Sequence, residues 1–311
     1  MYALDASRII RNAWRTSPAI SESGQDVGLV VGFLKDFCQF LKYCSLEQKV
    51  VVVFSEYAPL GRIEPDRFNR FYPRNEIELQ ENYSIMKQFL FSIFDYLPFY
   101  AINSKSLTDF DCMHLLRHVN EEDEFNVFAP FEEFCVFDSN KQCTSLYGDD
   151  FIKRNDGDWF SEKNLFAYEN SALFYALFGG RYSNKIATFQ KKTAVKMFPG
   201  LAEKRIEPKD LFSFCGGLDT ENMKNIVLAN RDKIEESYGL YLGSLKVKEI
   251  NKKAVTEYLS KNKKFSYSKF VTAIYRLGVY KHLKQEIDEI EKFSRSFSDF
   301  GQNKAMKRGD S

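Results

Sequence analysis

The stretch VVVVFSEYAP, residues 50–59, decides the fold class of this chain. Four valines and a phenylalanine follow one another without the polar alternation of a half-exposed strand, which predicts a strand buried on both faces. Such strands belong to parallel sheets that are covered by helices. The run ends at Ser55 and Glu56, at the carboxyl end of the strand, where α/β proteins place many of their binding and catalytic groups.

The segments around this strand alternate between strand and helix patterns. A short apolar strand, MYALDA (residues 1–6), ends at Asp5, and apolar residues at helical spacing over 27–43 connect it to the valine run, which predicts a right-handed β-α-β unit. Further strands are expected at 98–103, 125–130 and 133–138, further helices at 83–97 and 109–119, and a polar turn at 140–150. We therefore predict an α/β domain over residues 1–168, with a mostly parallel central sheet flanked by helices.

Strand patterns disappear after this region. Helical spacing recurs over 169–178, 191–198, 220–238, 252–259 and 267–293, which predicts an α-helical domain over residues 169–311. The last eleven residues, GQNKAMKRGDS, are polar and are expected to fray.

Composition is typical of a globular protein. The chain has 311 residues, of which 44% are hydrophobic and 28% charged. It contains neither a secretory leader pattern nor an apolar run long enough to span a bilayer, and its six cysteines form no C-x-x-C pair, so we expect reduced thiols and a cytoplasmic protein.

Charge is unevenly distributed. The net charge is +1, but residues 241–311 are basic and residues 119–170 are acidic. A basic tail can contact nucleic acid or an acidic protein, although solvated helix faces are the more common reason for such a pattern. A protein dedicated to wrapping DNA would be more basic overall.

Six landmarks follow one another along the chain: ALDAS at a first strand end, VVVVFSEY at a second, a basic bridge RFNRFYPRNE, SLTDFDCMHLL at a helix start, FAPFEEF at a third strand end, and LFGGRYSNKIATFQKKTAVKMF before a helical tail. Their order resembles the phage ribonuclease H type of 5′-nuclease, within the flap-endonuclease and PIN-like superfamily. The resemblance implies two divalent cations, held by carboxylates at the strand ends, that activate water and neutralise a phosphate.

The carboxylate positions of that family are mostly neutral here. The resemblance places them at eight residues: Asp5, Ser55, Thr108, Asp111, Phe131, Glu133, Gly180 and Ser183. Only three of these are acidic. Since magnesium is held by oxygen ligands that supply negative charge, we predict that the site has lost its catalytic function and holds no metal. The alternative is one weakly bound Mg²⁺ at Asp5 and Asp111, although these two residues more commonly cap helices.

Two further segments bear on nucleic-acid binding. In the helix-hairpin-helix motif implied by the resemblance, Lys192 is kept, but Thr188 and Gln190 stand where glycines would bring the backbone close to a phosphate, so we expect that contact to be lost. The basic bridge carries four arginines that suit either a 5′ phosphate or a protein partner: Arg62, Arg67, Arg70 and Arg74.

Other patterns point less clearly to chemistry. His114 and His118 lie four residues apart on one predicted helix face, a spacing that serves zinc sites, but no third ligand accompanies them. The chain has 30 Phe and 17 Tyr, and several of them stand in polar segments. Aromatic residues with arginine are common at protein interfaces and also stack on bases.

These observations predict a nuclease fold without nuclease activity, acting as a protein-interaction scaffold or adaptor encoded by a bacteriophage. The layout is similar to the nuclease-like factor with which nucleus-forming jumbo phages select proteins for import, which would place the chain in the host cytoplasm at the surface of the phage nucleus. Two alternatives stay open: a Mg²⁺-dependent 5′-3′ exonuclease or flap endonuclease with residual activity, and a nucleic-acid-binding protein without catalysis.

Overall fold

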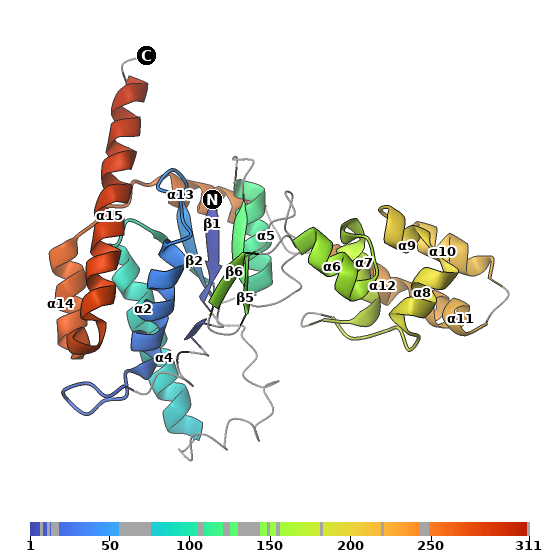
Figure 1. Cartoon of the computed structure of the whole chain (residues 1–311), viewed down its shortest axis with the longest axis horizontal. Coiled ribbons are helices and arrows are strands. Elements are labelled where there is room, and N and C mark those ends of the chain that lie inside the picture. The colour runs from blue at the N-terminus through green and yellow to red at the C-terminus, as the bar shows by residue number, and fades with distance from the viewer. Residues whose placement is uncertain are drawn as a thin grey trace. The chain divides into compact units, whose positions relative to one another are not determined.

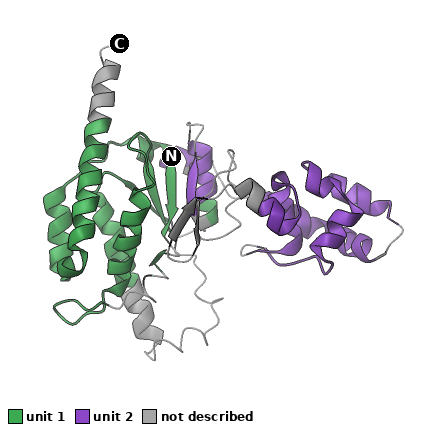
Figure 2. Cartoon of the chain, in the orientation of Figure 1, with its two compact units in different colours: residues 1–112, 256–311 green, residues 113–255 purple. Residues whose placement is uncertain are grey.

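The computed structural model describes residues 1–6, 9–10, 13, 19–55, 76–104, 109–120, 125–129, 144–147, 150–153, 156–180, 183–218, 221–242 and 249–309. The chain forms two compact units, which Figure 2 shows in different colours: unit 1, residues 1–112 with 256–311, and unit 2, residues 113–255. The two ends of the chain therefore belong to the same unit. The domain boundary at residue 168 stays a prediction.

Unit 1 contains three parallel strands: β1 (Tyr2–Asp5), β2 (Val50–Ser55) and β3 (Tyr100–Ser104). β2 lies between the other two, with Asp5 opposite Val53 and Ser55 opposite Ser104. All five residues from Val50 to Phe54 are 0% exposed. The apolar run therefore forms a strand covered on both faces, as its sequence predicts.

Helices cover these strands (Figure 1). The helical elements of unit 1 are α2 (Gly28–Leu41), α4 (Glu76–Ile93), the 3-10 turn η2 (Phe94–Tyr96), the first turn of α5 (Asp109–Val119), the end of α13 (Glu249–Ser260), α14 (Tyr267–Leu277) and α15 (Tyr280–Gly309). α2 and α15 pack side by side (Figure 1).

An aromatic cluster holds α2 onto the sheet. The ring of Phe37 meets the rings of Phe94 and Phe99 edge to face, with centroids 5.2 and 5.7 Å apart, and Phe33 contacts Phe54 of β2 at 5.8 Å. All five side chains are 0% exposed. Since burying a phenylalanine contributes about 1.5–3 kcal/mol, these rings dominate the local core.

The outer edge of β3 is covered by the end of α13. The hydroxyl of Tyr258 accepts a hydrogen bond from the Ala101 N–H (3.2 Å) and donates one to the Ala101 carbonyl (3.0 Å). The Tyr100 hydroxyl donates to the carbonyl of Lys261 at 2.8 Å. These bonds satisfy backbone groups that an open edge strand would expose.

Unit 2 contains the remaining strands and most of the short helices. Its elements are the greater part of α5 (Asp109–Val119), β4 (Asn126–Ala129), β5 (Thr144–Tyr147), β6 (Asp150–Lys153), α6 (Asp156–Asn164), η4 (Tyr168–Asn170), α7 (Ser171–Phe178), α8 (Lys191–Met197), α9 (Gly200–Glu203), α10 (Pro208–Gly216), α11 (Glu221–Ala229), α12 (Arg231–Tyr241) and the beginning of α13. β4 and β5 are parallel, whereas β5 and β6 are antiparallel. The hydrogen-bonding order of the strands is β3-β2-β1-β4-β5-β6, which confirms the predicted, mostly parallel α/β sheet followed by a helical region.

Some sequence predictions about elements are wrong. Residues 140–150 are not a polar turn throughout, because β5 and the first residue of β6 lie there and pair with each other. The tail does not fray at residue 301, since α15 continues to Gly309. The strand expected at 133–138 lies outside the described residues.

The long helical pattern of residues 267–293 is divided by a glycine. Gly278 takes a left-handed conformation (φ 73°, ψ 27°) and ends α14, and α15 begins two residues later. A Cβ at this position would lie 3.2 Å from the backbone nitrogen of Glu22, so the turn also packs closely against the segment before α2. Within the described part of the chain, every helix is too short or too polar to cross a bilayer.

Candidate functional site

Two of the predicted carboxylates are buried. Asp5 ends β1 and is 0% exposed, and Asp111 lies in the first turn of α5, the helix that follows β3, and is 8% exposed. Elements that follow parallel strands begin at the carboxyl edge of a sheet, where such proteins bind their ligands. These two carboxyl groups are the acidic part of the predicted site that the structure describes.

The other positions of the predicted cluster are described only in part. Ser55 ends β2, although its side chain is not described, and Thr108, Phe131 and Glu133 lie outside the described residues. Among the described residues, no group of three or more His, Cys, Asp or Glu side chains is placed to hold a metal ion.

Gly180 and Ser183 form a turn after α7 that is closed by internal hydrogen bonds. The Gly180 N–H donates to the carbonyl of Ser183 at 3.1 Å. The Ser183 hydroxyl donates to the carbonyl of Tyr175 at 2.9 Å and lies 3.0 Å from the hydroxyl of Tyr241. The side chain that replaces an expected acid therefore serves as a structural link between α7 and α12.

The residue before this turn has to be a glycine. Gly179 has φ 76°, and a Cβ there would lie 2.6 Å from the backbone nitrogen of Lys185. Only glycine allows the chain to approach itself so closely in this conformation. The conformation of the Gly-Gly pair is thus explained by local packing.

Tyr241 is the centre of a buried polar cluster that sequence reasoning missed. Its ring is 0% exposed and lies 5.4 Å from the ring of Tyr175, and its backbone hydrogen-bonds to His114. No local pattern marks this tyrosine, because its partner Ser183 is 58 residues away in the sequence. The cluster of Ser183, Tyr175, Tyr241 and His114, which we call the tyrosine cluster, connects three helical elements of unit 2.

His114 of the histidine pair is buried among the residues of unit 2. Burial, with a smaller contribution from the positive charge of His118, lowers the pKa of His114 from its usual 6.5 to about 3, against the opposing effect of its hydrogen bond with the Tyr241 backbone. His114 is therefore neutral at physiological pH. The described residues supply no third ligand beside the pair.

The segment where the resemblance predicts a helix-hairpin-helix motif has buried positions as well as exposed ones. Ala194 is fully buried, whereas Thr188, Gln190 and Lys192 are exposed. Lys191, the residue before Lys192, is less available to a phosphate than the exposed Lys192. Its ammonium group donates to Asn164 Oδ1 at 2.7 Å and lies 4.9 Å from the centre of the Phe174 ring. The loss of the phosphate contact stays a prediction, and the four bridge arginines, Arg62, Arg67, Arg70 and Arg74, lie outside the described residues.

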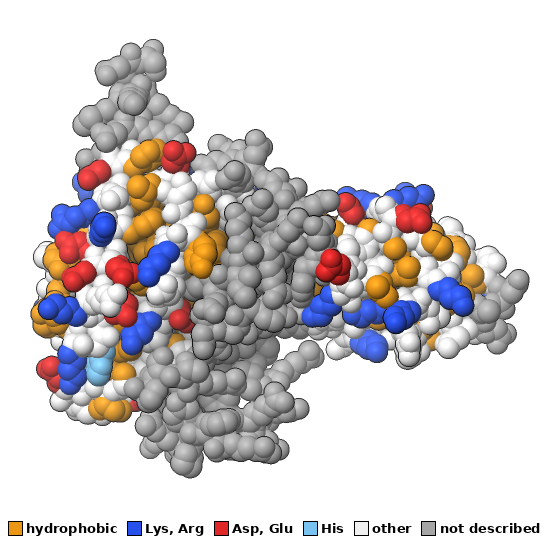
Figure 3. Space-filling view, in the orientation of Figure 1, with side chains coloured by type: hydrophobic (Ala, Val, Ile, Leu, Met, Phe, Trp, Pro, Cys, Tyr) orange, Lys and Arg blue, Asp and Glu red, His pale blue; other side chains and the backbone are white. Residues whose placement is uncertain are grey.

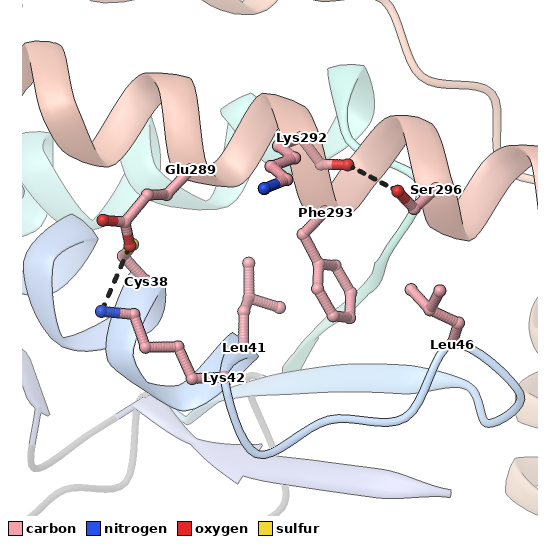
Figure 4. A pocket seen from close by; sticks show the side chains of 8 residues that line it. All are labelled: Cys38, Leu41, Lys42, Leu46, Glu289, Lys292, Phe293 and Ser296. Atoms are coloured by element: carbon pink, nitrogen blue, oxygen red, sulfur yellow. Dashed lines mark hydrogen bonds and ion pairs between the residues drawn. The ribbon is translucent and has the colours of Figure 1, made fainter.

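A groove of about 320 Å³ lies between α2 and α15 in unit 1 (Figure 4). Its apolar wall consists of Leu41, Leu46 and Phe293, whose side chains face the same space (Figure 4). Lys292 lies on the α15 side of this space (Figure 4). The space-filling view in Figure 3 shows hydrophobic side chains and lysine or arginine side chains close together on the face of unit 1 that it presents.

A compact polar contact closes one end of this groove. Glu289 accepts a hydrogen bond from the Cys38 thiol at 3.0 Å and pairs with the Lys42 ammonium group at 3.3 Å. Burial and the neighbouring Glu289 raise the pKa of Cys38 to about 12, so this thiol stays protonated and is not a nucleophile. Within the described residues, Lys292 takes part in no ion pair, which leaves positive charge at the groove.

Sequence comparison identifies no relative, since no family model and no curated protein matches the chain. The structure does have neighbours. The flap endonuclease of bacteriophage T5, in a pseudo-enzyme–product complex with DNA and metal ions, matches with a TM-score of 0.54 at 10% identity, over 94% of this chain and 98% of that chain.

Two further solved structures, both containing DNA, have a similar fold. The catalytic core of Rad2 in complex with a DNA substrate matches with a TM-score of 0.54 at 12% identity, over 93% of this chain and 90% of that chain. Human GEN1 in complex with Holliday junction DNA matches with a TM-score of 0.51 at 9% identity, over 95% of this chain and 71% of that chain. At these identities the comparison shows the fold alone, and the chain therefore has the 5′-nuclease fold of the flap endonucleases.

Proposed function

We propose that this chain is a nuclease-fold protein without metal-dependent hydrolysis, and that it works as a protein-interaction scaffold. The observation that carries the proposal is the position of Ser183. The resemblance places an acid there, whereas the hydroxyl bonds to the Tyr175 carbonyl and to Tyr241. A side chain committed to packing does not supply charge to a cation.

Charge supports the same conclusion. Two divalent cations carry four positive charges, and the acidic positions described in the predicted site are Asp5 and Asp111. Neutral residues at Ser55, Thr108 and Gly180 add no carboxylate. Since loss of a single group near a metal often lowers affinity or activity tenfold or more, the combined losses favour an inactive site.

The groove between α2 and α15 supports a binding role. A volume of about 320 Å³ is at the lower end of ligand pockets, and suits one or two side chains of a partner protein. Leu41, Leu46 and Phe293 favour an apolar side chain. Lys292 favours a carboxylate next to it, because Glu289 is already occupied by Cys38 and Lys42. We therefore propose a protein segment in which an apolar residue adjoins an acidic one.

Selection of phage proteins for import into a phage nucleus is one form of such scaffolding, and the overall resemblance is its support. It implies a phage-encoded chain in the host cytoplasm, with the partner being another phage protein. The four bridge arginines, Arg62, Arg67, Arg70 and Arg74, remain proposed contact residues for a partner.

A test of inactivity uses 5′-flap DNA and an RNA–DNA hybrid. The purified chain is incubated with excess Mg²⁺ or Mn²⁺ under single-turnover conditions, beside an Asp5→Asn variant purified in parallel. We expect both proteins to cleave no faster than the buffer. Cleavage by the natural chain that disappears with Asp5→Asn would establish the nuclease alternative.

The partner class is tested by selecting a random peptide display library on the immobilised chain. We expect peptides with an apolar residue beside Asp or Glu, which are lost on Leu46→Glu and on the charge reversal Lys292→Glu. Lys233→Glu, an equal charge change on the exposed face of α12, is the control and should retain them. Selected peptides that bind all three variants equally would remove the groove from the proposal.

DNA binding without catalysis is a second candidate, because Rad2 and GEN1 were both solved with DNA. Fluorescence anisotropy with a labelled flap substrate distinguishes it. Specific binding would persist in EDTA and weaken steeply with salt, and Lys192→Glu would reduce it. The scaffold proposal expects weak binding that does not respond to that substitution.

A further inference from the structure

A second hollow of unit 1, separate from the predicted metal site, lies where the loop between α13 and α14 meets the side of α15. Its volume is about 470 Å³, within the usual range for small-molecule pockets. It is lined by Pro98 and Tyr100, by the segment Asn262–Phe265 and by residues of α15.

The residues that line the hollow include more cations than acids. Lys263, Lys264 and Arg295 line it, against one acidic side chain, Asp299. Asp95 pairs with Lys263 only at 3.7 Å. Lys264 is exposed and, within the described residues, takes part in no ion pair. The lining therefore favours an anion.

Arg295 is held in place while part of it stays available. Its Nε and one terminal nitrogen donate to Glu291 Oε1 at 2.8 and 2.7 Å. The guanidinium group lies 5.9 Å from the centre of the Phe265 ring and 5.7 Å from that of Tyr267. A guanidinium group has five N–H donors, so others remain for a ligand, and its plane can stack on a flat ring.

Ring faces accompany the cations. Phe265 and Phe297 line the same hollow, and Phe297 is fixed by edge contact with Phe99, the centroids being 5.6 Å apart. An inorganic anion uses none of this surface. A ligand that combines an anionic group with a flat ring uses both the cations and the rings.

The loop that carries Lys263, Lys264 and Phe265 is fastened to η2 and to β3. The Ser266 N–H donates to the carbonyl of Tyr96 at 2.8 Å, and Lys263 Nζ donates to the carbonyl of Phe94 at 3.4 Å. Tyr100 bonds to the carbonyl of Lys261 at 2.8 Å. A loop held at three points loses little freedom when a ligand binds, which favours affinity.

We propose that this hollow binds a nucleoside phosphate, with the phosphate at Lys263, Lys264 and Arg295 and the base against the aromatic wall. The ligand is either a free nucleotide or the terminal nucleotide of a single strand, since both present the same chemistry. This inference does not depend on the scaffold role, and it concerns neither Asp5 nor the rest of the predicted metal site.

The test is isothermal titration of the full chain, at low salt, with adenosine monophosphate, ribose 5-phosphate, adenosine and a 5′-phosphorylated thymidine tetranucleotide. An aspartate-rich peptide is the fifth probe. We expect adenosine monophosphate, the tetranucleotide, or both, to bind at least tenfold more tightly than ribose 5-phosphate or adenosine. Ribose 5-phosphate lacks the base and adenosine lacks the phosphate. Binding by the mononucleotide indicates the free source, and binding by the tetranucleotide alone indicates a strand end.

Charge reversal at the mouth of the hollow gives the matched comparison. Lys264→Glu is expected to weaken nucleotide binding about tenfold, as loss of a charge-assisted contact does, whereas Lys269→Glu on neighbouring α14 should change it less than twofold. Crosslinking of 8-azido-adenosine monophosphate to the natural chain provides a readout without a variant, and the modified residues should lie within 262–267 or 295–299. No nucleotide binding at millimolar concentration, equal binding by ribose 5-phosphate, preference for the peptide, or crosslinks elsewhere would each overturn the proposal.

Discussion

Replacing Ser183 by aspartate restores one carboxylate that the 5′-nuclease resemblance calls for. The variant distinguishes a turn that can still contribute to a metal site from one that now serves only structural packing. The Ser183 hydroxyl donates to the Tyr175 carbonyl at 2.9 Å and shares a hydrogen bond with Tyr241 at 3.0 Å. An ionised aspartate cannot donate, so its oxygen would face the Tyr175 carbonyl with repulsion.

The magnitude follows from these contacts. Each lost hydrogen bond costs about 0.5–1.5 kcal/mol, and placing a charged group in a half-buried position adds a desolvation cost of similar size. We expect Ser183→Asp to lower the free energy of unfolding by about 2–3 kcal/mol, and Ser183→Ala, which adds no charge, to lower it by about 1 kcal/mol.

Urea unfolding followed by tryptophan fluorescence measures both variants, with and without 10 mM MgCl₂. Trp159 lies in α6, in the same unit as Ser183. We expect no difference with magnesium. If other carboxylates still converged on this position, an ion at 100 times its dissociation constant would stabilise Ser183→Asp by about 2.7 kcal/mol. Such a gain would refute the argument that the turn has been converted to structural packing.

Three further outcomes follow from the structure. Burial lowers the pKa of His114 in the folded chain from 6.5 to about 3, so below pH 6.5 protons bind the unfolded chain more tightly than the folded one. The free energy of unfolding should therefore be highest above pH 6.5 and fall toward pH 3 by up to about 1.4 kcal/mol per pH unit. Urea titrations at several pH values should show a smaller slope for His114→Gln. The Cys38 thiol, with its pKa raised to about 12 by burial and by Glu289, should resist iodoacetamide at pH 8, and Glu289→Gln should accelerate its alkylation; an unchanged rate would argue against that contact. Tyr258→Phe removes both hydrogen bonds to Ala101 and should lower the free energy of unfolding by about 1–2 kcal/mol. Hydrogen exchange should become faster at the backbone amides along the edge of β3. Unaltered exchange would show that α13 does not cover this edge.

Sequence patterns predict the elements that depend on local periodicity. The valine run forms β2, and the helix expected at 109–119 begins and ends at those residues. β5 and β6 have only four residues each and polar neighbours, so their pairing with each other determines them more than their own composition. Gly278 divides a continuous helical pattern because the chain approaches Glu22 there, a contact that periodicity does not reveal.

The candidate site is less accessible to sequence reasoning. The resemblance identifies Ser183 as a missing acid, but its partner Tyr241 is found only in the folded chain. The groove and the second hollow depend on α15 packing against segments far away in the sequence; Cys38 and Glu289, for example, are 251 residues apart. Contacts at such separation carry no local signal.

α15 is the element that the two proposed binding places share. Phe293 lines the groove and Phe297 lines the second hollow, and their rings are stacked with centroids 6.2 Å apart. A ligand that moves one ring must move the other or lose that contact, because packed side chains have few alternative positions. If a ligand at one place shifts the ring there, the affinities of the two places are therefore coupled. Any factor by which a nucleotide changes peptide affinity must equal the factor by which the peptide changes nucleotide affinity.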